Sequence, residues 1–214
     1  MTIVHHPTDE LLGSFAAGNL DQATQLVIAA HVSMCPCCQR LVSAFEQLGG
    51  TLLEAVDPVG LAPDAFDAAM WRIERQFEGR PGSARSRSGD DARLPRVLDY
   101  YDIGPVRWVA PGVSLRPIVL PGGGRARAFL LKSAPGTRML EHTHTDTELT
   151  CVLEGSFSHQ GGHFGPGDFD LGDEAVDHQP VVGPDGPCLC LVAMTGKLRI
   201  NGLLGRLIEP FIRL

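Results

Sequence analysis

The stretch that decides the fold of the C-terminal half reads Gly136-Thr-Arg-Met-Leu-Glu-His142-Thr-His144-Thr-Asp-Thr-Glu148-Leu-Thr-Cys-Val-Leu-Glu-Gly155. His142 and His144 are two residues apart, so on a β-strand both side chains face the same way. Glu148 follows after a turn, at the start of an apolar run. Imidazole and carboxylate ligands on adjoining strands can form an open site for zinc, iron, manganese or nickel. The stretch therefore predicts paired strands that hold a metal.

The sequence around this stretch also has a β pattern. Short runs rich in Val, Leu, Ile and Phe alternate with Gly and Pro turns. Many short strands at such spacing are typical of a sandwich or a barrel. The predicted runs are 113–120, 126–132, 148–157, 163–171, 188–194 and 197–204.

Three further histidines could supply a fourth ligand for this metal: His159, His163 and His178. His178 is the only one that follows the turn expected at Pro166-Gly167. Because His159 and His163 flank the pair Gly161-Gly162, we expect them to be solvent-exposed residues of a hairpin.

The segment 79–97 separates two regions of different character. It is built from Gly, Ser, Arg and Pro with almost no large apolar residue, so it cannot bury a core. We therefore expect a helical domain over 1–80, a flexible linker over 81–97 and a β domain over 98–214. The predicted fold class is α+β with two domains.

Helix signals fill the region before the linker. Thr8 and Asp21 can cap the first two helices, and Pro36 suits the first turn of a third helix. Gly49-Gly50 is expected to end the third helix, and Pro63-Asp64 opens a fourth. On the fourth helix, apolar residues recur at intervals of four, three and four, which is one helical face: Phe66, Met70, Ile73 and Phe77.

A second metal constellation lies in the helical region. His31-Val-Ser-Met-Cys35-Pro-Cys37-Cys38 places an imidazole near a Cys-x-x-Cys turn between two helices. A structural zinc site needs four such ligands in a tetrahedron, and His6, with His5 beside it, is the best candidate for the fourth. The alternatives are that Cys35 and Cys38 form a redox pair or simply pack. Cys37 falls on a different side and is expected to be a bystander.

These motifs resemble those of a known family. His31-x3-Cys35-x2-Cys38 with an upstream His resembles the zinc-binding anti-sigma domain, and Gly136-x5-His-x-His-x3-Glu-x6-Gly155 matches the first cupin motif without gaps. In this order, they resemble the ChrR-type anti-sigma factors. The resemblance implies zinc on His6, His31, Cys35 and Cys38, and a cupin barrel or jelly roll holding zinc or another divalent transition metal. The second cupin motif has a Pro-Gly turn and a later His, so the resemblance implies His178 as the fourth ligand beside His142, His144 and Glu148.

The resemblance also implies a function. The family represses a sigma factor of the extracytoplasmic-function type and releases it on stress from singlet oxygen or organic hydroperoxides. The N-terminal domain suffices for inhibition, and the cupin domain is needed for the response. The fourth helix, with Phe66, Met70, Ile73 and Phe77, would pack on the sigma factor in a 1:1 complex.

Two features bear on sensing and on an alternative function. Cys188 and Cys190 are two residues apart on an expected strand, so both thiols face the same side of the sheet. They are either a redox pair that senses the signal or two small core residues. Such neighbours do not readily form an unstrained disulfide. Because cupins include dioxygenases and isomerases, the alternative function is a cupin metalloenzyme with an accessory zinc domain.

Charge and hydropathy limit the partners. The net charge is −7, and residues 1–80 carry ten acidic and four basic side chains. Because phosphate binding requires clustered Lys and Arg, this region is poorly suited to nucleic acid but suited to a basic protein. No apolar run approaches the length of a membrane span, and the N-terminus lacks a signal-peptide pattern. We therefore expect a cytoplasmic protein.

Overall fold

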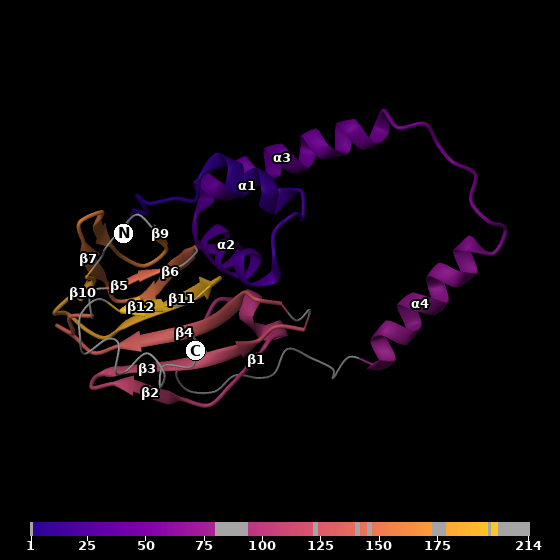
Figure 1. Ribbon diagram of the computed structural model, residues 1–214. Helices are drawn as coiled ribbons and strands as arrows, with labels where there is room; N and C mark the ends of the chain where they lie inside the picture. The colour runs from indigo at the N-terminus through magenta and orange to yellow at the C-terminus, as the bar shows by residue number, and fades with distance from the viewer. Residues whose placement is uncertain are drawn as a thin grey trace.

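The computed structural model shows four N-terminal helices followed by an antiparallel β domain (Figure 1). It describes residues 2–79, 94–121, 124–139, 142–144, 147–172, 179–196 and 198–200, and gives no side chains at 76–79, 142–144 and 198–200. The helices are α1 (Asp9–Ala16), α2 (Gln22–Met34), α3 (Pro36–Glu54) and α4 (Ala65–Gly79). The predicted fold class is confirmed.

The starts of the first three helices follow the predicted capping residues. The Thr8 hydroxyl accepts a hydrogen bond from the Leu11 N–H, and the Asp21 carboxylate accepts from two N–H groups in the first turn of α2. Each bond satisfies a donor that has no partner within its helix. Pro36 occupies the first turn of α3, where its missing N–H costs nothing.

The predicted end of the third helix at Gly49-Gly50 is wrong. Both glycines are helical, and α3 continues to Glu54 with Ala55 as its C-cap. Glycine costs about 1 kcal/mol relative to alanine inside a helix, but it ends a helix only where the chain turns left-handed. No such turn occurs here, so the preceding turns of α3 propagate through the pair.

The described residues of the β domain form three antiparallel sheets. The largest has the order β1-β3-β4-β11-β6-β9, with β2 also paired to β3; the second is β10-β7-β8, and the third pairs β12 with β5. The strands are β1 (Asp102–Ile103), β2 (Arg107–Ala110), β3 (Val113–Val119), β4 (Arg127–Ser133), β5 (His142–His144), β6 (Glu148–Glu154), β7 (Phe157–His159), β8 (Gly162–Phe164), β9 (Phe169–Gly172), β10 (Val181–Val182), β11 (Cys188–Met194) and β12 (Leu198–Ile200).

Gly155 divides the predicted run 148–157 into β6 and β7. Its φ is +72°, and an added Cβ would collide with the backbone of Pro187. Glycine is therefore required at this turn for conformation and for space. The turn lets β7 leave the large sheet and pair with β8 in the second sheet.

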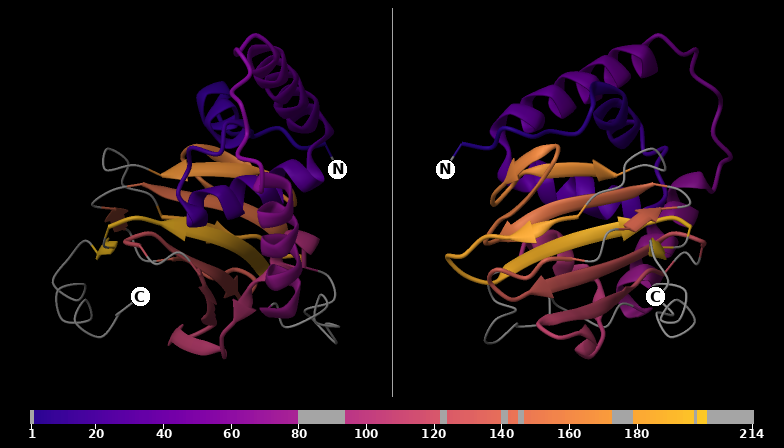
Figure 2. Two further views of the ribbon diagram at one scale, coloured as in Figure 1. Left: turned by 90° about the vertical axis from the view of Figure 1, so that its right-hand side faces the viewer. Right: turned by 60° about the vertical axis from the view of Figure 1, so that its left-hand side comes forward.

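Two apolar cores lie on opposite faces of the large sheet. On β11, Leu191 and Ala193 face α2 and share a core with its buried residues, including Leu26 and Ile28. Val192 and its same-face neighbours instead pack against the second sheet. The large sheet is therefore covered by helices on one face, as Figure 2 shows, and residues of its other face pack against the second sheet.

The chain re-enters this core after the Gly- and Arg-rich segment. Leu94 and Leu98 are buried, and the short 3-10 helix η2 (Arg96–Tyr100) packs against α2. Most of the predicted linker, residues 81–93, lies outside the described residues. Helices α1–α3 and the β domain thus share a core rather than touching only through a linker.

Helix α4 projects away from the rest of the molecule. Figure 1 shows that the C-terminal half of α3, the segment 55–64 and α4 form an arm that extends beyond the β domain. No single helix among the described residues is long and apolar enough to span a membrane. Helices α2 and α3 meet that test of length and composition only as a pair, which is bent by 117°.

Candidate metal centre and partner surface

Four ligand-type side chains converge where the N-terminal segment crosses the junction of α2 and α3. Each of His6, His31, Cys35 and Cys38 offers one ligand atom, and the four atoms lie within 4.8 Å of one another. His31 comes from the last turn of α2, Cys35 is the N-cap of α3, and Cys38 lies in the first turn of α3. The structure therefore brings the predicted ligands together, with His6 rather than His5 in the cluster.

The distances in this cluster fit a tetrahedral metal ion. His6 Nδ1 lies 3.4 Å from the Sγ atoms of both Cys35 and Cys38, and His31 Nε2 lies 3.2 Å from Cys38 Sγ. With ordinary zinc–sulfur and zinc–nitrogen bond lengths, the edges of a tetrahedral site measure roughly 3.3–3.8 Å. Two sulfur and two imidazole ligands also match the donor set of structural zinc. The residues present therefore fit zinc.

Burial sets the ionisation of these ligands. Burial is the main cause that lowers the pKa of His31, so its imidazole is neutral, which is the form that binds metals. Burial, aided by the neighbouring Cys35, raises the pKa of Cys38 well above that of a free thiol. A thiolate there requires a compensating cation, so metal binding would release a proton from Cys38.

Only part of the predicted cupin metal site can be placed. The backbone of β5 carries His142 and His144 and pairs with β12, but their side chains and all of His178 lie outside the described residues. Glu148 begins β6, and burial, followed by the charge of Asp170, raises the pKa of its carboxyl group to about 7. The four-ligand site of His142, His144, Glu148 and His178 therefore stays a prediction.

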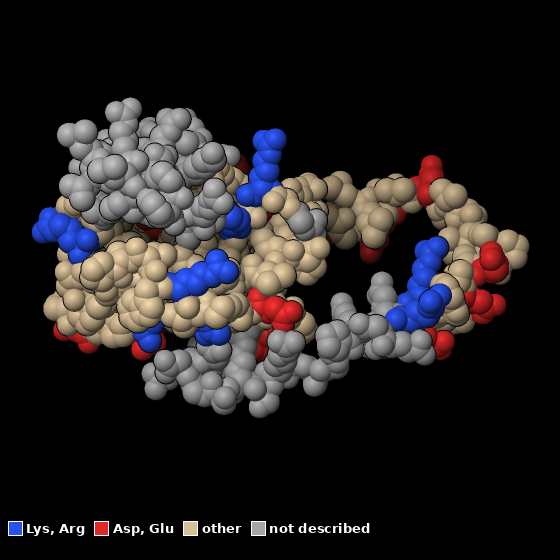
Figure 3. Space-filling model, turned by 60° about the horizontal axis from the view of Figure 1, so that its bottom comes forward, with Lys and Arg blue, Asp and Glu red and all other residues tan. Residues whose placement is uncertain are grey.

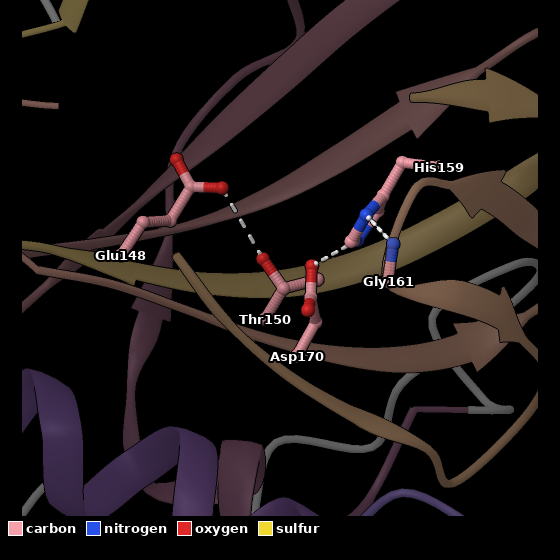
Figure 4. Close-up of polar contacts among 5 residues, drawn as sticks. All are labelled: Glu148, Thr150, His159, Gly161 and Asp170. Carbon is pink, nitrogen blue, oxygen red and sulfur yellow. Dashed lines mark hydrogen bonds and ion pairs between the residues drawn. The ribbon is translucent and has the colours of Figure 1, made fainter. Parts of the chain in front are cut away.

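We expected His159 to be exposed to solvent in its hairpin, but the structure shows its side chain buried. Its Nδ1 accepts a hydrogen bond from the Gly161 N–H, so its proton is on Nε2, which donates to the Asp170 carboxylate at 2.9 Å (Figure 4). The His159 side chain is only 6% exposed, and its ring stacks on Phe164. The expectation failed because the partner of His159, Asp170, lies on β9, outside the hairpin of β7 and β8. His163 is exposed, as predicted.

Cys188 and Cys190 lie side by side on β11, as their spacing predicts. Both are buried free thiols, and their Sγ atoms are 3.6 Å apart, in contact without a bond. The hydrogen bond between them raises the pKa of Cys190 and lowers that of Cys188. They pack in the core between the two larger sheets, so the structure gives them a packing role and leaves the redox role a prediction.

The arm carries a large exposed apolar surface. The predicted stripe residues Phe66, Met70 and Ile73 are 75%, 41% and 46% exposed, so they are not core residues of this chain. The side chain of Phe77 lies outside the described residues. Further exposed apolar side chains lie along α3, the following segment and α4: Leu48, Leu52, Leu53, Val56, Val59, Leu61 and Trp71.

Exposed apolar side chains in this number are typical of a protein interface. In the space-filling view of Figure 3, the arm stands off from the body and leaves an open space beside α4. Acidic side chains are spread along it in the same view. Its described residues include Asp57, Asp64 and Asp67, so the surface suits a basic partner with apolar contacts.

Comparisons with known proteins agree with both halves of this description. The family described as the ChrR cupin-like domain matches residues 99–198. The anti-sigma-E factor ChrR of Cereibacter sphaeroides is 39% identical over 217 residues, covering the whole of both chains. In the crystal structure of Rhodobacter sphaeroides SigE in complex with the anti-sigma ChrR, one chain has 33% identity and a TM-score of 0.74, covering 90% of this chain and 100% of that one. The chain therefore belongs to the family of ChrR-type anti-sigma factors.

Proposed function

We propose that this protein is an anti-sigma factor that binds an extracytoplasmic-function type sigma factor in a 1:1 complex. The observation that carries the proposal is the arm, whose apolar side chains have no partner surface among the described residues of this chain. The similar solved chain was crystallised with SigE, and the full-length relative is an anti-sigma factor. This relationship does not support the metalloenzyme alternative.

In this proposal the N-terminal cluster holds zinc and thereby fixes the base of the arm. Helix α3 begins at the cluster and supplies the first apolar residues of the arm, so the metal sets the direction in which α3 leaves the body. A structural zinc site contributes folding free energy directly. Loss of the metal would therefore change the surface offered to the sigma factor.

We further propose that the complex dissociates under oxidative stress. The thiolate of Cys35 or Cys38 would attack the outer oxygen of a hydroperoxide and break the O–O bond, which gives a sulfenic acid and an alkoxide that takes up a proton from water to leave as an alcohol. The oxidised sulfur is a poorer metal ligand, so the site would lose its metal. The cupin domain, with its own metal on His142, His144, Glu148 and His178, is proposed to be needed for this response.

Co-expression with a candidate sigma factor from the native host tests the first proposal. We expect co-purification as a 1:1 complex by size-exclusion chromatography with light scattering. Phe66→Asp and Ile73→Asp should weaken binding at least about 30-fold, since central apolar contacts typically contribute 2 kcal/mol or more. Trp108→Asp is the matched control, because Trp108 is 73% exposed on β2, away from the arm.

Two further variants test the metal and the response. Cys38→Ser should abolish the complex, whereas Glu148→Ala should leave binding intact but slow its dissociation on treatment with an organic hydroperoxide. The proposal fails if no sigma factor of the host co-purifies with the chain. It also fails if charged residues on the arm weaken binding no more than Trp108→Asp does. Equal release from wild type and Glu148→Ala would exclude the proposed role of the cupin metal site.

A further inference from the structure

The turn Gly165–Phe169 of the β domain touches the N-terminal metal cluster. The Gly167 carbonyl lies 2.7 Å from His31 Nδ1, and His31 is fully buried. A carbonyl oxygen can only accept a hydrogen bond, so Nδ1 must carry the proton. The lone pair of His31 is therefore on Nε2, the atom that faces Cys38. The β domain thus sets the tautomer and the orientation of a metal ligand in the helical region.

The same turn holds the segment that leads into the second histidine ligand. The Oδ1 atom of Asp168 accepts hydrogen bonds from the backbone N–H groups of Val4 and His5, at 2.8 and 2.9 Å. Its Oδ2 atom accepts from the Gly165 N–H at 2.8 Å. The Phe169 N–H donates to the His5 carbonyl at 3.1 Å, so the segment lies along the edge strand β9. His6 follows directly after these anchored residues.

Close packing keeps this segment against the turn. Gly167 has a φ of +90°, and an added Cβ would collide with the side chain of Ile3. The ring of His5 stacks on Phe164 at a centroid distance of 4.3 Å. Asp168 itself is only 4% exposed, so its hydrogen bonds are shielded from water. The contact is therefore built from backbone, carboxylate and apolar parts together.

We propose that the turn Gly165–Phe169 is the outer shell of the N-terminal metal site, and that Asp168 is its positioning residue. The inference rests on the proposed metal site of the preceding section. Outer-shell partners fix the orientation of ligand rings, and their loss typically weakens metal binding by about 10- to 100-fold. A displacement of this turn within the β domain would therefore loosen both histidine ligands without first disturbing α2 or α3.

Release of cobalt from the full-length protein tests this inference. Co²⁺ replaces zinc at tetrahedral sites, and its thiolate charge-transfer band reports the Cys35–Cys38 site, because the predicted cupin ligands include no sulfur. The loaded chain is mixed with excess chelator and the decay of the band is followed. We expect Asp168→Ala and Val4→Pro to release cobalt at least about tenfold faster than wild type.

Matched variants separate positioning from folding. Val4→Pro removes one N–H that Asp168 accepts, whereas Val4→Ala keeps it and alters only an exposed side chain. Val4→Ala should therefore release cobalt at the wild-type rate. Because the Val4 side chain is exposed, Val4→Pro opens no cavity in the core that the helices and the β domain share. The His31 Nδ1 proton, followed by nitrogen-15 NMR, should exchange faster with water in both loosened variants.

The possible outcomes are distinct. Release rates within twofold of wild type in both Asp168→Ala and Val4→Pro would overturn the inference while leaving the metal site intact. Equally fast release from Val4→Ala and Val4→Pro would also overturn it, because the lost N–H would not be the cause. A wild-type chain with no thiolate band would overturn the proposed metal site, and this inference with it.

Discussion

Replacing His6 with alanine isolates the contribution of the metal to the stability of the helical region. His6 is exposed, so His6→Ala removes a metal ligand without opening a cavity in the core. Through the metal, His6 is tied to His31, which closes a loop of about 25 residues. The chain-entropy estimate for a cross-link of that length is about 3.5 kcal/mol. We therefore expect His6→Ala to lower the free energy of unfolding by about 3–4 kcal/mol in the presence of zinc.

The measurement is a four-way comparison of urea unfolding, followed by circular dichroism. Wild type and His6→Ala are each unfolded with zinc and with excess chelator. Without metal, an exposed histidine contributes little, so the two proteins should differ by less than about 0.5 kcal/mol. The difference between the two conditions then gives the metal-dependent term directly.

His163→Ala serves as the control for this comparison. His163 is an exposed histidine of β8 and is not one of the four clustered ligands, so the change in the free energy of unfolding should be the same with and without zinc. The reasoning is refuted if His6→Ala destabilises equally in both conditions, because His6 would then act through packing. It is also refuted if zinc does not stabilise the wild-type chain.

Three further predictions concern the packing of Ile28, the carboxyl group of Glu148 and the reactivity of the thiols. Ile28→Ala should lower the free energy of unfolding in urea by about 2–5 kcal/mol, because Ile28 of α2 is fully buried against the sheet. A decrease below about 1 kcal/mol would contradict that packing. In metal-free protein the raised pKa of Glu148 means that the folded state holds a proton the unfolded state has lost, so stability should fall as pH rises from 4.5 to about 7. Glu148→Gln should flatten this slope in pH-dependent thermal melts, and an unchanged slope would contradict the prediction. Exposed Cys37 should be alkylated at once in the folded protein, whereas Cys151, fully buried and with a pKa raised to about 12, should react only on unfolding; mass spectrometry distinguishes the two.

The parts of the fold that could be predicted depend on local chemistry. Thr8, Asp21 and Pro36 act within one helical turn, so their positions alone indicate where helices begin. The ligand spacing of His31, Cys35 and Cys38 is similarly local, since one helix end and one turn bring three of the four ligands together. The spacing of these three residues does not identify His6 as the fourth ligand. That prediction required the family resemblance or a choice between the nearby histidines His5 and His6.

The features that escaped prediction depend on contacts between distant residues. His159 is paired with Asp170 of another strand, so its short hairpin sequence gives no sign of its burial. The role of Asp168 toward Val4 and His5 joins positions more than 160 residues apart. The continuation of α3 through Gly49-Gly50 was missed because glycine marks a helix end only when the chain turns there.

The arm has a consequence for the lifetime of the unbound chain. Segments that lack tertiary contacts and expose apolar side chains are the preferred substrates of cellular proteases and chaperones. Because α4 projects away from the body (Figure 1), we expect the free protein to present a cleavage point there, and a bound sigma factor would shield it. Turnover of the unbound chain would then match the amount of inhibitor to the amount of its partner, with no dedicated control of its synthesis.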